Sequence, residues 1–143
     1  MGFRRFRPGR PPAVRLGGAA GMLLLAAGCA GLNPGSGEAA ATAQQFHQLL
    51  DAGKAGAACR LLAPGTTEEV ESDDPGSCAA KLSRLGLSPA AGVLESRAYG
   101  REAQVRLEGD TVFLTRSGDR WVVTAAGCTA RNERPYLCEV KGD

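Results

Sequence analysis

The first 28 residues decide how much of this chain is left to fold. They contain no acidic residue, and an uncharged, largely apolar run from Leu16 to Gly28 ends them. The basic residues before that run are Arg4, Arg5, Arg7, Arg10 and Arg15. A basic segment followed by a short apolar one is the order of parts in a secretory signal. The run of 13 residues is shorter than the roughly 20 that a membrane-spanning helix needs. We therefore expect residues 1–28 to be an export signal that is removed.

Small residues stand directly before Cys29. The stretch consists of Leu25, Ala26, Ala27, Gly28 and Cys29. It resembles the lipobox of bacterial lipoproteins, a family that more often has leucine at the position of Ala26. The resemblance implies that Cys29 carries diacylglycerol and becomes the mature N-terminus, anchored in the cell membrane on its extracytoplasmic face. Each methylene buried in the bilayer contributes about 0.8 kcal/mol to membrane binding, so two acyl chains anchor a protein stably whereas one chain binds only marginally.

Other interpretations of this segment stay open. It could be an ordinary cleaved signal with a chance cysteine, or an apolar helix of the core. Arg4 and Arg5 could also direct export by the twin-arginine route, although the surrounding residues match that motif poorly.

Removal of the signal reverses the charge of the chain. The full sequence has a net charge of +2, but 12 basic residues against 15 acidic ones remain after residue 28, which gives −3. The basic pI of the full chain, about 8.4, is therefore due to the arginines of the export segment. A net negative charge gives no reason to expect binding to nucleic acid.

Membrane lipid bound through Cys29 is the expected partner. A second expected partner is an envelope protein or a small ligand of unknown identity.

The remaining 115 residues are enough for one compact domain and too few for two. Residues 29–37 are rich in glycine, serine and proline and lack apolar periodicity, which predicts a flexible tether. A single domain is then expected over residues 38–143.

The first half of this domain has helical periodicity. A helix is predicted from Glu38 to about Ala52–Gly53, and a second from Ala55 to Leu62, ended by Pro64 and Gly65. The polar, acidic stretch 66–74 is expected to be an exposed loop. A third helix is predicted from Ser77 to Leu85, where Gly86 would end it.

The second half changes to the two-residue period of strands. Strands are predicted at residues 93–99, 102–108, 111–116 and 120–125, separated by glycine-containing turns. Short turns between successive strands favour consecutive antiparallel pairing. Helices followed by strands predict an α+β fold, with the N-terminal helices packed on one face of a curved antiparallel sheet of about four strands.

Two resemblances extend this prediction. The order of elements resembles truncated members of the NTF2-like superfamily, in which a curved sheet wraps a helix to form a cone. Several stretches also resemble lipoproteins of unassigned function from high-GC Gram-positive bacteria. These stretches are residues 58–64, 109–115, 121–128 and 134–138. The second resemblance implies an anchor and a fold and no particular activity.

Four cysteines remain besides Cys29. An even set in an exported chain suggests disulfides, and four cysteines allow three pairings. We favour Cys59 with Cys78, which would join two helices across the acidic stretch, and Cys128 with Cys138, which would close a loop after the last strand. The alternative is a metal or redox site, but the sequence has one histidine and no CxxC motif. We therefore expect two disulfides, no metal and no cofactor.

The remaining polar candidates favour structural roles. His47 could be a general base, but a lone histidine on a polar helix face is more often a surface residue. An acidic run could collect calcium, yet it lacks the alternating ligands and glycine of a calcium loop. Its members are Glu68, Glu69, Glu71, Asp73 and Asp74. We expect a solvated stretch and no catalytic residue.

Three aromatic residues of the strand region are candidates for a ligand pocket. Phe113, Trp121 and Tyr136 could line such a pocket, although aromatic residues in strands more often belong to the core. The expected function is a non-catalytic, membrane-anchored envelope lipoprotein whose domain binds a partner. The alternative is an NTF2-like cone with a small-molecule pocket and an enzyme site. Arg97, Glu102 or Arg106 turned into a cavity would favour that alternative, and a filled cone would favour the first hypothesis.

Overall fold

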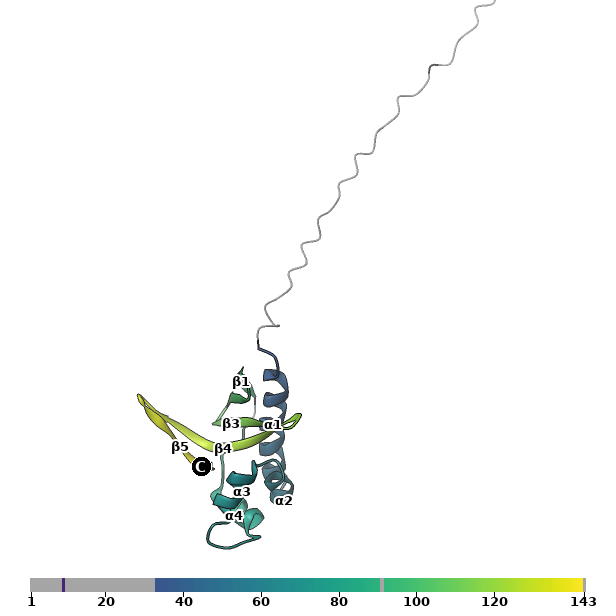
Figure 1. The fold of residues 1–143 in the computed structure, drawn as a ribbon. Helices are drawn as coiled ribbons and strands as arrows, with labels where there is room; N and C mark the ends of the chain where they lie inside the picture. The colour runs from purple at the N-terminus through teal and green to yellow at the C-terminus, as the bar shows by residue number, and fades with distance from the viewer. Residues whose placement is uncertain (1–8, 10–32, 91, 143) are drawn as a thin grey trace, which may run out of the picture.

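The computed structural model describes residue 9 and residues 33–90 and 92–142, so Cys29 and the lipobox lie outside the described residues. The described part is an α+β domain in which the helices precede an antiparallel sheet of five strands (Figure 1). The helices are α1 (Ser36–Asp51), α2 (Ala55–Cys59), α3 (Pro64–Val70) and α4 (Cys78–Leu85). The strands are β1 (Val93–Tyr99), β2 (Glu102–Leu107), β3 (Asp110–Ser117), β4 (Arg120–Arg131) and β5 (Arg134–Lys141).

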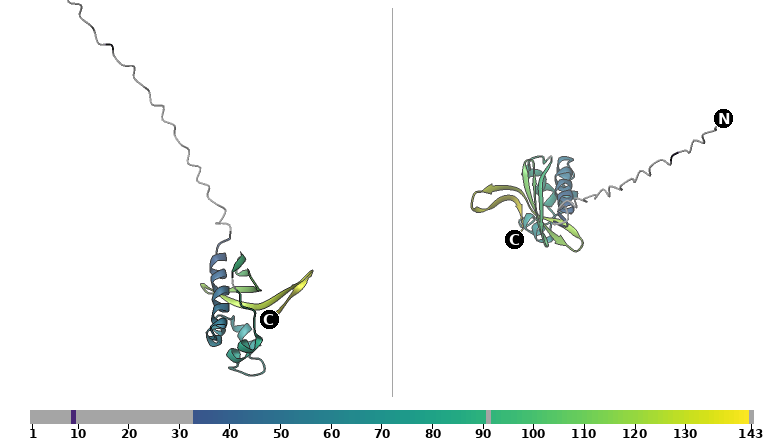
Figure 2. Two further views of the ribbon diagram at one scale, coloured as in Figure 1. Left: turned by 180° about the vertical axis from the view of Figure 1, so that it is seen from behind. Right: turned by 90° about the horizontal axis from the view of Figure 1, so that it is seen from above.

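Helix α1 lies against one face of the sheet, as Figures 1 and 2 show. Its buried residues are Ala39, Ala43, Phe46 and His47, which share one side of a helix because they are spaced by about one turn. The small alanines let the backbone of α1 approach the sheet closely, and Phe46 fills the core at 0% exposure.

The folded domain begins earlier than the sequence predicted. Helix α1 starts at Ser36, within the predicted tether, and Gly35 precedes it with φ +87°. Asn33 Oδ1 accepts the backbone N–H of Ala98 at 2.7 Å, and Ser96 donates its hydroxyl to the carbonyl of Ser36 at 2.6 Å. These two bonds fix the start of α1 to the edge strand β1.

The region after α1 contains one helix more than was predicted, and the helix that begins at Ala55 is shorter. Helix α2 ends at Cys59, and Pro64 begins the short helix α3, which takes up the first part of the stretch expected to be a loop. Proline fits the first turn of a helix because the N–H that it lacks has no helical partner there. The prediction that Pro64 ends the preceding helix is therefore wrong. Helix α4 follows the prediction closely and ends at Leu85, and Gly86 directly after it has a φ of +58°.

The sheet is an open meander in the order β1-β2-β3-β4-β5, so the predicted consecutive antiparallel pairing is confirmed. Residues of β2 and β3 that face α1 alternate with residues of the opposite face. Val105 pairs with Val112 and Ala103 with Leu114, and all four are buried. This filled face forms the core together with α1.

The C-terminal hairpin was not predicted. Strand β4 extends to Arg131, six residues beyond the expected end, and β5 pairs with it as a fifth strand. Strand β4 also holds one extra residue, Thr124, opposite β3, and Gly127 takes a φ of +65°. Bulges and positive-φ glycines bend strands. The β4–β5 hairpin accordingly projects away from α1 (Figures 1 and 2).

Both predicted disulfides are present. Cys59 at the end of α2 is bonded to Cys78 at the start of α4, with Cα atoms 6.2 Å apart. Cys128 and Cys138 are directly opposite each other on β4 and β5. The second disulfide thus crosses a pair of strands, whereas the sequence suggested the closure of a loop.

Within the described part of the chain, no helix combines the length and the apolar character needed to cross a membrane.

Candidate functional site

The most unusual buried group is a pair of ionisable side chains from distant parts of the sequence. His47 on α1 is 1% exposed, so its expected place on the surface is wrong. Its Nε2 lies 2.7 Å from Oδ2 of Asp110, the first residue of β3. Buried ionisable groups persist only when they are paired, and each of these two side chains supplies the partner of the other.

Asp110 also accepts hydrogen bonds from the backbone of β4, beyond the point where β3 and β4 stop pairing. Its Oδ2 accepts the N–H of Gly127 at 2.9 Å, and its Oδ1 accepts the N–H of Cys128 at 2.8 Å. The register between β3 and β4 ends at Phe113 and Ala125, so beyond that pair β4 has no ladder partner on β3. The carboxylate therefore replaces the missing carbonyls of the ladder.

The pair joins helix α1 to strand β4. The carboxylate receives three hydrogen bonds, from α1 and from two adjacent residues of β4. The His47 ring is covered and packs edge-on against Phe46, with ring centroids 5.5 Å apart. Asp110 and His47 thus fix the helix to the point where β4 bends, and we call them the clamp.

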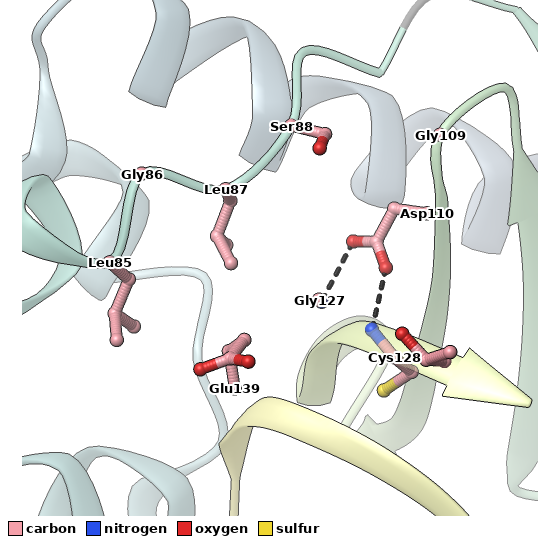
Figure 3. A pocket seen from close by; sticks show the side chains of 10 residues that line it. Leu85, Gly86, Leu87, Ser88, Gly109, Asp110, Gly127, Cys128 and Glu139 are labelled. Carbon is pink, nitrogen blue, oxygen red and sulfur yellow. Dashed lines mark hydrogen bonds between the residues drawn. The ribbon is translucent and has the colours of Figure 1, made fainter.

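A polar pocket of about 260 Å³ lies beside the clamp (Figure 3). It is lined by Leu85, Gly86, Leu87, Ser88, Gly109, Asp110, Gly127, Cys128, Thr129 and Glu139. Both oxygens of Asp110 point toward the backbone of Gly127 and Cys128 in this view. The carboxylate that lines this pocket is thus already hydrogen-bonded to the backbone of the protein.

Gly127 is required at the bend for two reasons. Its φ of +65° disfavours any residue with a side chain, and an added Cβ would lie 2.7 Å from Cδ2 of Leu87. We predict that Gly127→Ala lowers the free energy of unfolding by at least about 2 kcal/mol in urea titrations. Gly118→Ala is the matched control, because Gly118 has the same φ with nothing within 4 Å. Equal losses in the two variants would show that the contact with Leu87 is unimportant.

The three candidate aromatic residues do not meet in one pocket. Trp121 is 4% exposed and lies on the core side of β4. Phe113 alternates with buried residues of β3 and so lies on the opposite face, where its ring packs edge-on against Tyr136 at 5.1 Å. The Tyr136 hydroxyl accepts a hydrogen bond from Gln104 at 3.1 Å. Two of the three thus join the β4–β5 hairpin to the outer face of the sheet.

The three charged residues that would favour an enzyme site if they faced a cavity are all exposed. Arg97, Glu102 and Arg106 lie on the outer face of β1 and β2. Arg97 donates to Glu95 at 2.7 Å and Arg106 does so at 3.2 Å. These hydrogen bonds, first from Arg97 and then from Arg106, hold the pKa of Glu95 below its ordinary value, although desolvation opposes them.

The lowered pKa of Glu95 predicts a titration effect. Because the folded-state pKa lies below the unfolded one, the contribution to stability is present above the unfolded pKa and is lost as the pH falls through the folded pKa. We expect Arg97→Gln to raise the midpoint of the Glu95 carboxyl titration, followed by ¹³C NMR. Arg84→Gln, on α4, should leave it unchanged. A midpoint that Arg97→Gln does not move would contradict this assignment.

The acidic run is distributed over helix and turn. Glu71 accepts the backbone N–H of Cys78 at 3.1 Å and so caps the start of α4, while Asp73 lies 3.6 Å from Lys81. Glu68, Glu69 and Asp74 are exposed. Among the described residues, no group of three or more His, Cys, Asp or Glu side chains is placed to hold a metal ion.

Sequence reasoning missed Asp110 altogether. It follows Gly109 and resembles an ordinary turn residue, and its partner His47 is 63 positions away. A signal was present in the spacing, since His47 lies four residues after Ala43 and so on the buried side of α1, where a histidine needs a polar partner.

The chain matches no protein-family model, and no curated protein and no solved structure is significantly similar to it.

Proposed function

We propose that this chain is an exported lipoprotein, held at the extracytoplasmic face of the cell membrane by lipid on Cys29, whose domain binds a partner without catalysis. The domain is proposed to be a truncated relative of the NTF2-like cone. The observation that carries the non-catalytic part is the clamp, because its three hydrogen bonds to the protein engage both oxygens of the carboxylate.

The two disulfides support the exported location. Disulfides persist in oxidising compartments outside the cytoplasm and are rare inside it. Every cysteine after Cys29 is bonded, in the pairs Cys59–Cys78 and Cys128–Cys138. Cys29 is then the one cysteine left for lipid.

A filled core supports binding at the surface over binding inside a cone. Phe46, Val105 and Leu114 are fully buried between α1 and the sheet. Large apolar side chains are exposed instead on the two edge strands, with Leu94 and Tyr99 on β1 and Leu137 on β5. Exposed edge strands with apolar side chains are surfaces at which another chain can pair.

A second candidate function is the binding of a small molecule beside the clamp. The pocket of about 260 Å³ that meets Asp110 favours it. This pocket is polar, and Ser88, Thr129 and Glu139 line it together with Asp110. A small polar ligand suits that lining better than an apolar one.

The anchor can be tested by membrane fractionation in a bacterium that processes lipoproteins. The wild-type chain should sediment with the membrane and Cys29→Ala should not, because the variant cannot accept diacylglycerol. Cys29→Ala that stays in the membrane fraction would contradict the lipid anchor. A photoreactive residue at Leu137, compared with one at the exposed Arg84, would then test whether the partner contacts the hairpin.

A further inference from the structure

The described chain that follows the proposed lipid anchor is bonded to one end of the sheet. Asn33 Oδ1 accepts the backbone N–H of Ala98 at 2.7 Å, and the carbonyl of Ser36 accepts the hydroxyl of Ser96 at 2.6 Å. Both partners belong to the last part of β1, which ends at Tyr99. The start of α1 and the β1–β2 turn therefore lie at the same end of the domain, whereas α3 and α4 lie at the opposite end of α1 (Figure 1).

Covalent geometry limits how far this end can lie from Cys29. Asn33 is four positions after Cys29. A chain spans at most about 3.6 Å per residue, so Asn33 lies within about 14 Å of the cysteine whatever the conformation between them. Lipid on Cys29 would thus hold the end of the domain that contains Asn33 next to the bilayer.

An exposed aromatic residue stands at this end. Tyr99 is 61% exposed, more than any other large apolar residue in the described part of the chain. Tyrosine combines an apolar ring with a polar hydroxyl and is enriched where a membrane meets water. Arg101, two residues later in the same turn, is also exposed. The β1–β2 turn therefore presents a side chain suited to the headgroup layer together with a cation.

The end of β3 lies beside this turn and adds a second arginine. The backbone N–H of Arg116 donates to the carbonyl of Arg101 at 2.8 Å, and the hydroxyl of Thr115 donates to the same carbonyl at 3.2 Å. The guanidinium of Arg101 in turn donates to the carbonyl of Arg116. These bonds fix the two segments against each other, so the β1–β2 turn is a firm surface.

The two ends of the domain differ in charge. Residues 97–102 together with Arg116 and its partner Glu38 contain three arginines and two glutamates, which gives +1. Residues 66–85 at the other end contain two basic residues and five acidic ones, which gives −3. The five are Glu68, Glu69, Glu71, Asp73 and Asp74. A bilayer with anionic headgroups attracts the first end and repels the second.

We propose that the β1–β2 turn contacts a bilayer of anionic phospholipid, with Tyr99 at the level of the headgroups. The inference rests on the proposed lipid anchor and adds the orientation of the domain to it. The acidic stretch 68–74 then faces away from the membrane, and the edge strand β5 remains accessible to the partner.

Quenching by brominated lipids measures which side chain approaches the bilayer. The full chain is produced in a bacterium that processes lipoproteins, the lipid on Cys29 is verified by mass, and the protein is placed in phosphatidylglycerol vesicles brominated near the headgroup. We expect the fluorescence of Tyr99→Trp to be quenched more than that of Leu94→Trp. Leu94 is the matched control, because it is 58% exposed on the same strand and its position is roughly 17 Å from that of Tyr99. Trp121 is buried and is common to both variants.

A third variant reports on the acidic end. The side chain of Asp73 is 91% exposed, and Asp73→Trp should be quenched no more than the wild-type chain. Equal quenching of Tyr99→Trp and Asp73→Trp in a lipidated chain would overturn the orientation and leave the anchor intact. A chain without lipid on Cys29 would overturn the anchor, and this inference with it.

Charge reversal tests the contact with anionic headgroups. In the Tyr99→Trp chain, Arg101→Glu should reduce the quenching by phosphatidylglycerol vesicles, whereas Arg84→Glu should not. Both arginines are exposed, but Arg84 belongs to α4 at the opposite end of the domain. Circular dichroism checks that both variants keep the fold. The same change in the two variants would overturn the proposed contact between the β1–β2 turn and the anionic headgroups.

Discussion

Asp110→Asn is expected to lower the free energy of unfolding by about 3 kcal/mol or more, because it disrupts a buried, charge-assisted network. Asparagine offers one acceptor oxygen in place of two, and its NH₂ group would face donors. The carboxylate now accepts from His47, Gly127 and Cys128. Urea unfolding followed by circular dichroism measures the loss.

Asp119→Asn is the control, since Asp119 is exposed in the β3–β4 turn and should cost little. His47→Gln removes one partner of the clamp and should cost less than Asp110→Asn. The double variant should cost less than the sum of the two, because residues that contact each other are energetically coupled. If Asp110→Asn were as stable as Asp119→Asn, the clamp would not be structural.

The second large effect is expected from the disulfide between α2 and α4. Removing it in the variant Cys59→Ala with Cys78→Ala should lower stability by about 3 kcal/mol through the greater freedom of the unfolded chain. The bonded cysteines are 19 positions apart, so this bond closes the longer loop of the two disulfides.

Removing Cys128 and Cys138 together is the comparison. These residues are only 10 positions apart, and the β4–β5 ladder already holds them opposite each other. The loss should therefore be smaller than for the first disulfide. Thermal unfolding under oxidising conditions gives both values, and a larger loss for the second pair would contradict this account.

The elements that the sequence predicted well are those with local signals. Strand β1 begins and ends at the expected residues, and α4 ends at Leu85, before Gly86, as expected. Strand β5 was missed because its residues are largely polar or exposed, with Pro135 near its start and only Val140 buried. Its place depends on pairing with β4 and on Cys138, which local patterns do not encode.

The candidate site was much less predictable than the fold. The burial of His47 depends on Asp110, and the position of Asp110 depends on where β3 and β4 separate. The indole of Trp121 meets Gly35 only after α1 docks on the sheet. Contacts between residues so far apart in sequence follow from the tertiary fold, whereas turn residues and strand alternation act locally.

The proposed export and lipid anchor are tested most directly by the mass of the mature N-terminus. The protein is purified from the membranes of a bacterium that processes lipoproteins, and its N-terminal peptide is analysed by mass spectrometry. We expect a peptide that begins at Cys29 and carries the added mass of diacylglycerol. An unmodified N-terminus at any other residue would contradict it.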